Sequence, residues 1–200
     1  MILSSSLAQK DVIGFVVFGN GAFDFRILRA LCKRFNGIKK LAAPQLSGEK
    51  GFISALKTVT WLIDNIQVNW QKTSLIIIID KEHIENPDDM KKHLVNFFTY
   101  EVKQEDSNNQ YFEFEVQRGP KKTTLYIIVL GFNKRVEENI SRLIKEEYGE
   151  DIPPEKQKIR DFLHRKNMRI EDLIKNSSEK ALNNAFSNLM KLLRKLDYSP

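Results

Sequence analysis

The sequence predicts an α/β fold, with a central, mostly parallel sheet flanked by helices and a helical C-terminal extension. Short runs rich in Val, Ile and Phe alternate with segments whose apolar residues recur at helical spacing. The run Leu75 to Ile79 is apolar on both faces, as a central parallel strand between two layers of helices must be. Pro153-Pro154 marks a boundary, beyond which the chain is charged and helical. We therefore expect an α/β domain over residues 1–150 and a helical extension over residues 151–200.

Composition limits the class of protein. The 200 residues have a hydrophobic share of 42%, which is enough for a packed core and excludes a disordered chain. The formal net charge of +6 favours association with polyanions. Cys32 is the single cysteine, so an intramolecular disulfide and a cysteine cluster for zinc are both excluded. The longest apolar runs fall far short of the roughly 20 residues of a membrane helix, and no secretory pattern is present, so we expect a cytoplasmic protein without membrane contact.

Strand and helix patterns alternate in the first half of the chain. Val12 to Phe18 predicts the first strand, and apolar residues from Phe23 to Phe35 recur at helical spacing. Ile38 to Ala43 predicts a short second strand. The segment from Phe52 to Ile66 predicts a second helix, which leads to the buried strand ending at Ile79.

The second half predicts a hairpin between two helices. Asp88-Asp89 indicates a helix start, with Met90 to Tyr100 continuing the helix. Tyr111 to Val116 alternates apolar and acidic residues, which is typical of a strand with one solvated face, and we expect it at a sheet edge. Gly119-Pro120 then turns the chain into a longer strand, Thr123 to Leu130, so we expect a mixed sheet.

The remaining segments predict amphipathic helices. An apolar face runs from Val136 to Ile144 and ends near Gly149. Three further segments follow Pro154, the last from Ala181 to Leu196. Their apolar faces must be covered, so we expect the tail to pack either on the sheet domain or on a second subunit.

Two strand ends carry groups suited to a phosphate and a metal ion. Ligands of such folds bind at the C-terminal ends of parallel strands, beside helix N-termini. The first end is Gly19-Asn20-Gly21-Ala22-Phe23-Asp24, whose glycines allow positive φ and a close approach of the backbone to phosphate. The second is Asp80-Lys81-Glu82, whose carboxylates project to the same side if the chain stays extended. A helix cap or a solvated turn is the ordinary alternative for such carboxylates, and spacing alone favours it.

Together these two segments resemble the Toprim family, the catalytic domain shared by bacterial-type primases, type IA and II topoisomerases, recombination-mediator proteins and overcoming-lysogenisation-defect nucleases. In that family a first strand leads into a glutamate-glycine turn with a downstream acidic residue, and a later hydrophobic strand ends in Asp-x-Asp. The resemblance extends over about Val12 to Ile144. It implies a Toprim-like, Rossmann-like sheet, a Mg²⁺ cofactor that Mn²⁺ can replace, and DNA or RNA as the partner.

The resemblance also implies roles for individual residues. Asn20 stands in the position of the family's glutamate, Gly21 matches the glycine, and Asp24 matches the next acidic position. Asp80 and Glu82 match the Asp-x-Asp pair and would hold the metal. The implied catalytic set is therefore Asn20, Asp24, Asp80 and Glu82, and the phosphate-binding set is Gly19, Gly21 and Arg26.

Asn20 is a departure that bears on catalysis, because an amide cannot act as the general acid or base that the family's glutamate is taken to be. Three functions remain open. The chain is a nucleic-acid or nucleotide-phosphate binding protein with a degenerate site, an active Mg²⁺-dependent nuclease or phosphoryl-transfer enzyme, or an assembly protein that forms homo-oligomers through its C-terminal helices.

Overall fold

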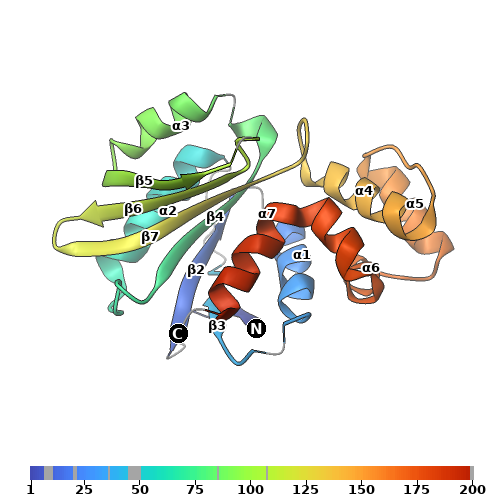
Figure 1. Ribbon diagram of the computed structural model, residues 1–200, viewed down its shortest axis with the longest axis horizontal. Helices are drawn as coiled ribbons and strands as arrows, with labels where there is room; N and C mark the ends of the chain where they lie inside the picture. The colour runs from blue at the N-terminus through green and yellow to red at the C-terminus, as the bar shows by residue number, and fades with distance from the viewer. Residues whose placement is uncertain are drawn as a thin grey trace.

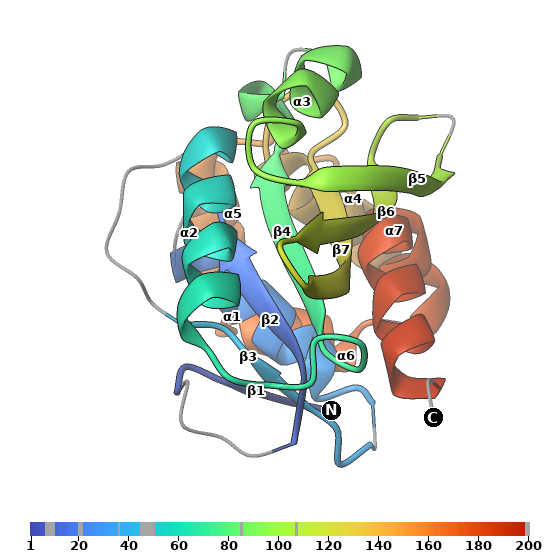
Figure 2. The ribbon, with the colours of Figure 1, turned by 90° about the vertical axis from the view of Figure 1, so that its left-hand side faces the viewer.

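The computed structural model describes residues 1–6, 11–19, 22–35, 37–44, 51–84, 86–106 and 108–198, with the side chains of residues 22 and 23 left out. Within these ranges the chain forms a seven-stranded sheet with helices on both faces (Figures 1 and 2). The strands are β1 (Ile2–Ser4), β2 (Val12–Phe18), β3 (Lys40–Ala42), β4 (Ser74–Asp80), β5 (Thr99–Glu105), β6 (Tyr111–Arg118) and β7 (Lys121–Leu130). The helices are α1 (Ala22–Cys32), α2 (Phe52–Asn65), the 3-10 turn η1 (Lys81–His83), α3 (Pro87–Leu94), α4 (Val136–Tyr148), α5 (Lys156–Arg165), α6 (Ile170–Asn176) and α7 (Glu179–Tyr198).

The sheet is mixed and mostly parallel, as the sequence predicts. Its strand order is β1-β3-β2-β4-β7-β6-β5, with the first five strands parallel and the β6–β7 and β5–β6 pairs antiparallel. β4 lies at the centre, where Ile76 is paired with Val16 on one side and Tyr126 on the other. Since helices cover both of its faces, all its residues after Ser74 are buried.

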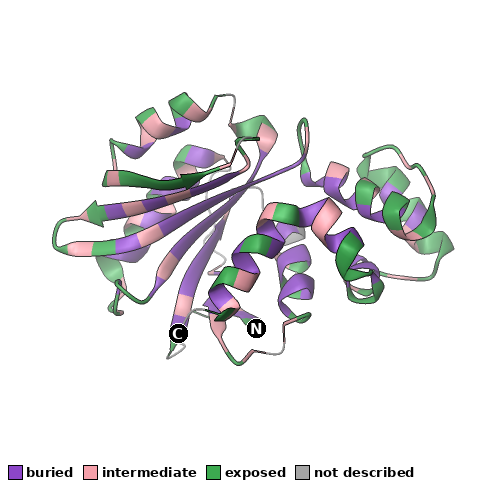
Figure 3. Ribbon diagram, in the orientation of Figure 1, coloured by how far each residue is buried: buried purple, intermediate pink, exposed green. Residues whose placement is uncertain are grey.

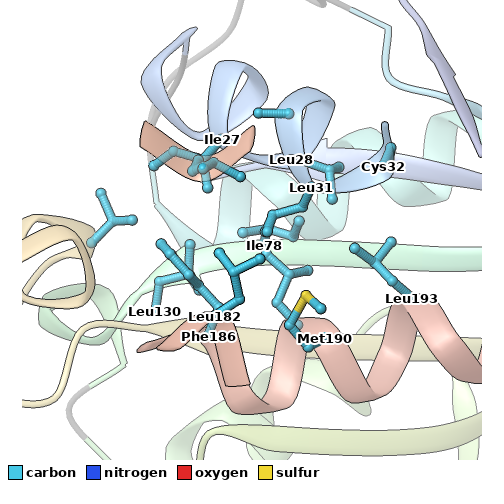
Figure 4. Close-up of a cluster of buried hydrophobic side chains, with 14 of the residues drawn as sticks. Ile27, Leu28, Leu31, Cys32, Ile78, Leu130, Leu182, Phe186, Met190 and Leu193 are labelled. Atoms are coloured by element: carbon cyan, nitrogen blue, oxygen red, sulfur yellow. The ribbon is translucent and has the colours of Figure 1, made fainter. Parts of the chain in front are cut away.

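Two apolar layers enclose the sheet because alternate residues of each strand face opposite sides. Ile76 and Ile78 of β4 pack with α1, α4 and the C-terminal helices, whereas Leu75 and Ile77 pack with α2 and α3. Figure 4 shows Ile78 between Leu28 of α1 and the side chains of α7. The burial pattern in Figure 3 follows the same division, with buried residues on the inner side of each helix.

The C-terminal helices cover the sheet. Their apolar faces therefore pack on the sheet domain, the first of the two alternatives expected from the sequence. Leu189 and Leu193 of α7 have exposures of 1% and 0% and belong to the same cluster as Ile78 and Leu28. α6 packs against α1, and α7 packs against α4. Residues before and after Pro153-Pro154 therefore share one core.

The structure differs from the sequence analysis in one strand that was not predicted and in two predictions that are wrong. β1 was not expected, and it pairs with β3 at one edge of the sheet. The helix predicted from Met90 to Tyr100 ends at Leu94, and Thr99–Glu105 forms β5. β5 is almost entirely exposed, so it has no buried face to produce a period-two pattern. Because β5 occupies the edge, β6 is not the edge strand.

None of the helices in the described ranges is both long enough and apolar enough to cross a bilayer.

Candidate functional site

Asp24 and Asp80, both predicted site residues, come together at the carboxyl edge of the sheet. β2 and β4 are parallel neighbours. Asp80 is the last residue of β4, and Asp24 lies in the first turn of α1, the helix that follows β2. Their exposures are 3% for Asp24 and 5% for Asp80. After burial itself, the charge of Asp80 is the largest influence raising the pKa of Asp24, so the two carboxyl groups interact.

A third carboxylate, Glu137, lies at the same edge. It is 3% exposed and belongs to the first turn of α4, the helix that follows β7. Its charge also raises the pKa of Asp24. We call Asp24, Asp80 and Glu137 the acidic cluster. Sequence reasoning missed Glu137, although its position after the neighbouring parallel strand was an available signal.

Asp24 is the unusual member of the acidic cluster. Burial, followed by the charges of Asp80 and Glu137, raises the pKa of Asp24 to about 8, while Lys156 acts in the opposite direction. At neutral pH this carboxyl is therefore mostly protonated. Its Oδ2 atom is buried, and no group in the described part of the chain forms a hydrogen bond with it. Such an orphaned polar atom inside a protein is uncommon and calls for a physical explanation.

Asp80 has a structural role as well. Its Oδ1 accepts a hydrogen bond of 3.0 Å from the backbone N–H of Val136, the first residue of α4. The carboxylate thus caps a helix from a neighbouring strand, and its negative charge lies at the positive end of the helix dipole. The ordinary alternative for an acidic strand end therefore applies to Asp80, but it does not account for Asp24.

The carboxylate of Glu82 is held by Arg135. The expectation of an extended segment is wrong, because Lys81–His83 form a 3-10 turn. With about three residues per turn, successive side chains point in different directions. Glu82 Oε2 lies 2.7 Å from Arg135 Nε, and Lys81 Nζ donates to the carbonyl oxygen of Phe132 over 2.8 Å. Glu82 also lines a cavity of about 550 Å³ between the start of α2 and α3.

The described residues contain no group of three or more His, Cys, Asp or Glu side chains that could hold a metal ion. Mg²⁺ commonly takes only one or two protein carboxylates and completes its coordination with water and substrate phosphates. Asp24 and Asp80 are the pair that fits this requirement, because they interact and one of them has an unsatisfied oxygen. Glu82 does not join them, since Arg135 holds its carboxylate.

The predicted phosphate-binding residues have other contacts or lie outside the description. Gly21 falls outside the described residues, as does Asn20 of the predicted catalytic set. The backbone of Gly19 does not have a positive φ, so its conformation does not require glycine. A Cβ at this position would lie 2.9 Å from the side chain of Ile79, so close packing against Ile79 explains why the residue is glycine. Arg26 forms a two-pronged ion pair with Glu171 of α6, with both N–O distances 2.7 Å, and so fastens the tail to α1.

Two exposed cations flank the acidic cluster. The Arg135 and Lys156 side chains are 55% and 66% exposed. Lys156 Nζ lies 3.5 Å from Glu137 Oε1. Glu82 is the main cause that raises the pKa of Arg135, and Glu137 and Asp80 contribute as well. Several other basic residues are committed to ion pairs, among them Arg118 with Asp64, Lys122 with Glu115, and Lys195 with Glu113.

No family model, curated protein or solved structure matches this chain.

Proposed function

We propose that this chain is a divergent Toprim-like protein that binds the phosphates of nucleic acid or of a nucleotide through Mg²⁺, held at the acidic cluster by Asp24 and Asp80. The observation that carries the proposal is the buried Oδ2 of Asp24, which has no hydrogen-bond partner among the described residues and lies next to Asp80 at the carboxyl edge of parallel strands. A divalent cation would replace the proton of Asp24 and satisfy this oxygen.

The location supports the proposal. Parallel α/β sheets bind ligands at the carboxyl ends of neighbouring strands, and β2 and β4 are such neighbours. Asp24 and Asp80 also occupy two of the acidic positions that the Toprim resemblance assigns. A purely structural role explains Asp80, which caps α4, but gives no reason to bury an acid with a free oxygen at Asp24.

Each group has a defined role. Asp24 and Asp80 supply the carboxylate oxygens, and Glu137 adds negative charge beside them. Arg135 and Lys156 are exposed at the rim, where they pair with Glu82 and Glu137 respectively, and they attract the phosphate by charge. The cation supplies neutralisation of the phosphate charge when it is bound. Because Asn20 has no carboxyl to move a proton, we expect binding without turnover.

Removal of the charge at Asp80 tests this function. In Asp80→Asn the amide oxygen can still accept from the N–H of Val136, so the cap of α4 is kept while the metal ligand is weakened. We expect Mg²⁺ to tighten binding of a fluorescent single-stranded or duplex oligonucleotide by about tenfold in the unaltered protein and to have no effect in Asp80→Asn, as measured by anisotropy with Mg²⁺ or EDTA.

Two further variants make the test specific. Asp161→Asn, an exposed change on α5, should keep the Mg²⁺ effect. Glu82→Gln should also keep it; loss in Glu82→Gln alone would place the metal at Asp80 and Glu82 instead. A Mg²⁺ effect that survives Asp80→Asn, or no binding of either oligonucleotide, would refute the proposal. Cleavage of the oligonucleotide in the same samples would identify the active nuclease.

A further inference from the structure

A second cavity is lined in part by Lys81, the residue before Glu82. Its volume is about 520 Å³, within the range of small-molecule sites. One wall is the segment after β7, which contributes Phe132, with Arg142 of α4. A second wall is α7, which contributes Asn183, Asn184 and Ser187, and Gln110 also lines the space. We call this space the amide-lined cavity.

The cavity wall contains a bend in α7. Phe186 has φ −130° and ψ 40°, which are not helical values, and the bend is visible in Figure 1. No proline or glycine accounts for it, since residues 179–198 contain neither. Asn183 and Asn184 precede the bend and Ser187 follows it, so the bend shapes the cavity.

One buried side chain fixes both walls. Asn139 of α4 is 5% exposed; its Nδ2 donates to the carbonyl oxygen of Ala185 over 2.6 Å, beside the bend. Its Oδ1 accepts from the N–H of Gly131 over 2.7 Å, at the end of β7. A polar side chain committed in this way holds the strand end and the bent helix at a set spacing.

The lining combines an aromatic ring, amides and positive charge. The Arg142 guanidinium carbon lies 5.1 Å from the centroid of the Phe132 ring. Lys81 adds a second cation, and no acidic residue is among the described residues that line the cavity. Behind the lining, Glu146 Oε1 lies 3.9 Å from Arg142 Nε, and Glu146 also accepts from Asn184.

Part of this lining already makes hydrogen bonds: Gln110 Nε2 donates to the carbonyl oxygen of Gly131, Asn184 Nδ2 donates to Glu146, and Asn183 Oδ1 accepts from Arg194. The exposed Ser187 and Asn108 also line the cavity.

We propose that the amide-lined cavity binds one nucleotide unit. A base can stack on the Phe132 ring or the Arg142 guanidinium, as bases do on aromatic rings and arginine planes. The Asn108 amide, the Ser187 hydroxyl and the remaining polar atoms of the other lining amides match donor and acceptor groups on a base edge, and Lys81 with Arg142 supplies positive charge for the phosphate. The unit is either a free nucleotide or the end of a single strand. This site needs no metal ion and stands apart from the acidic cluster.

Calorimetric titrations of the full-length chain in EDTA test the proposal. The probes are the four nucleoside 5′-monophosphates, a 5′-phosphorylated tetranucleotide and inorganic phosphate. We expect a nucleotide or the tetranucleotide to bind at least about tenfold more tightly than phosphate. Tighter binding of a mononucleotide would identify a free nucleotide as the ligand, and tighter binding of the tetranucleotide would identify the end of a single strand. Phosphate binding as tight as that of every other probe, or no binding of any nucleotide probe, would overturn the proposal.

Three variants locate the site. Arg142→Ala should weaken binding by about tenfold or more, because a charge-assisted contact and a stacking surface are lost. Ser187→Phe, at an exposed position, should block the cavity to a similar degree, with thermal unfolding used to verify the fold. Arg160→Ala, an exposed arginine of α5, is the matched control and should bind normally.

Binding unchanged in both Arg142→Ala and Ser187→Phe would refute the cavity as the site. Asp80→Asn should leave this binding intact, which separates it from failure of the Mg²⁺ site.

Discussion

At the scale of the residue, Asp24 shows how surroundings alter an ordinary carboxyl group. An Asp side chain normally has a pKa near 3.8, but burial and two neighbouring negative charges raise the pKa of Asp24 to about 8. The folded chain therefore keeps a proton that the unfolded chain has lost at neutral pH. In the unfolded state the group returns to its ordinary value, so the stability of the fold depends on pH.

Asp24→Asn should remove this pH dependence. For Asp24 the folded-state pKa is the higher one, so the contribution of this group to the free energy of unfolding falls as pH rises between about 4 and about 8. Asn cannot ionise, so the stability of the variant relative to the unaltered protein should increase by roughly 1.4 kcal/mol per pH unit across this window. Urea unfolding at pH 5 and pH 8 measures the difference. An equal pH slope in both proteins would show that Asp24 has an ordinary pKa.

The individual site residues were predictable only in part. Asp24 and Asp80 follow parallel strands that a hydrophobic pattern identifies, and the structure brings them together. The direction of Glu82 was not predictable from spacing, because it depends on a 3-10 turn and on Arg135, which is distant in sequence. Glu137 was overlooked because it lies within an acidic helix start, a common feature of solvated helices.

At the scale of the element, the bend of α7 depends on a polar contact from α4. Asn139 bonds to the carbonyl oxygen of Ala185 beside the bend, and also to the N–H of Gly131. The amphipathic pattern of α7 predicts one continuous helix and contains no sign of the bend. The same limit applies to β5, whose exposed residues carry no period-two signal, whereas the strongly patterned β4, β6 and β7 were predicted correctly as strands.

Asn139→Ala should destabilise the fold strongly. The Gly131 N–H and the Ala185 carbonyl would lose their buried partner, and each such loss costs about 1–3 kcal/mol. The control is Asn133→Ala, at an exposed position of the same β7–α4 connection. Guanidinium unfolding of the two variants gives the comparison. If Asn139→Ala were as stable as the control, Asn139 would not hold these elements together.

At the scale of the whole molecule, one core joins the sheet to the C-terminal helices. The sequence predicted the α/β class, the mixed sheet and the helical tail, because each depends on periodicity within a segment. It left open what the tail covers, since the partner of an amphipathic face is not encoded in the face itself. In the structure Leu193 of α7 packs in the cluster that contains Leu28 of α1.

Leu193→Ala tests the role of the tail. If α7 is part of the protomer core, the variant should lose about 2–5 kcal/mol of unfolding free energy, with a midpoint that does not depend on protein concentration. Lys180→Ala, at an exposed position of α7, should change stability by less than about 0.5 kcal/mol. A midpoint that rises with protein concentration in the unaltered chain, and loses this dependence in Leu193→Ala, would favour assembly through α7.

The most direct test of the Mg²⁺ site is to count the protons released when Mn²⁺ binds. Calorimetric titrations at pH 7 in two buffers of different ionisation enthalpy give this number. Asp24, with a pKa of about 8, is mostly protonated at this pH. If Asp24 and Asp80 hold the ion, close to one proton should leave per ion bound, and Asp24→Asn should release none. Mn²⁺ binding without proton release, or no Mn²⁺ binding at all, would contradict a metal site at the acidic cluster.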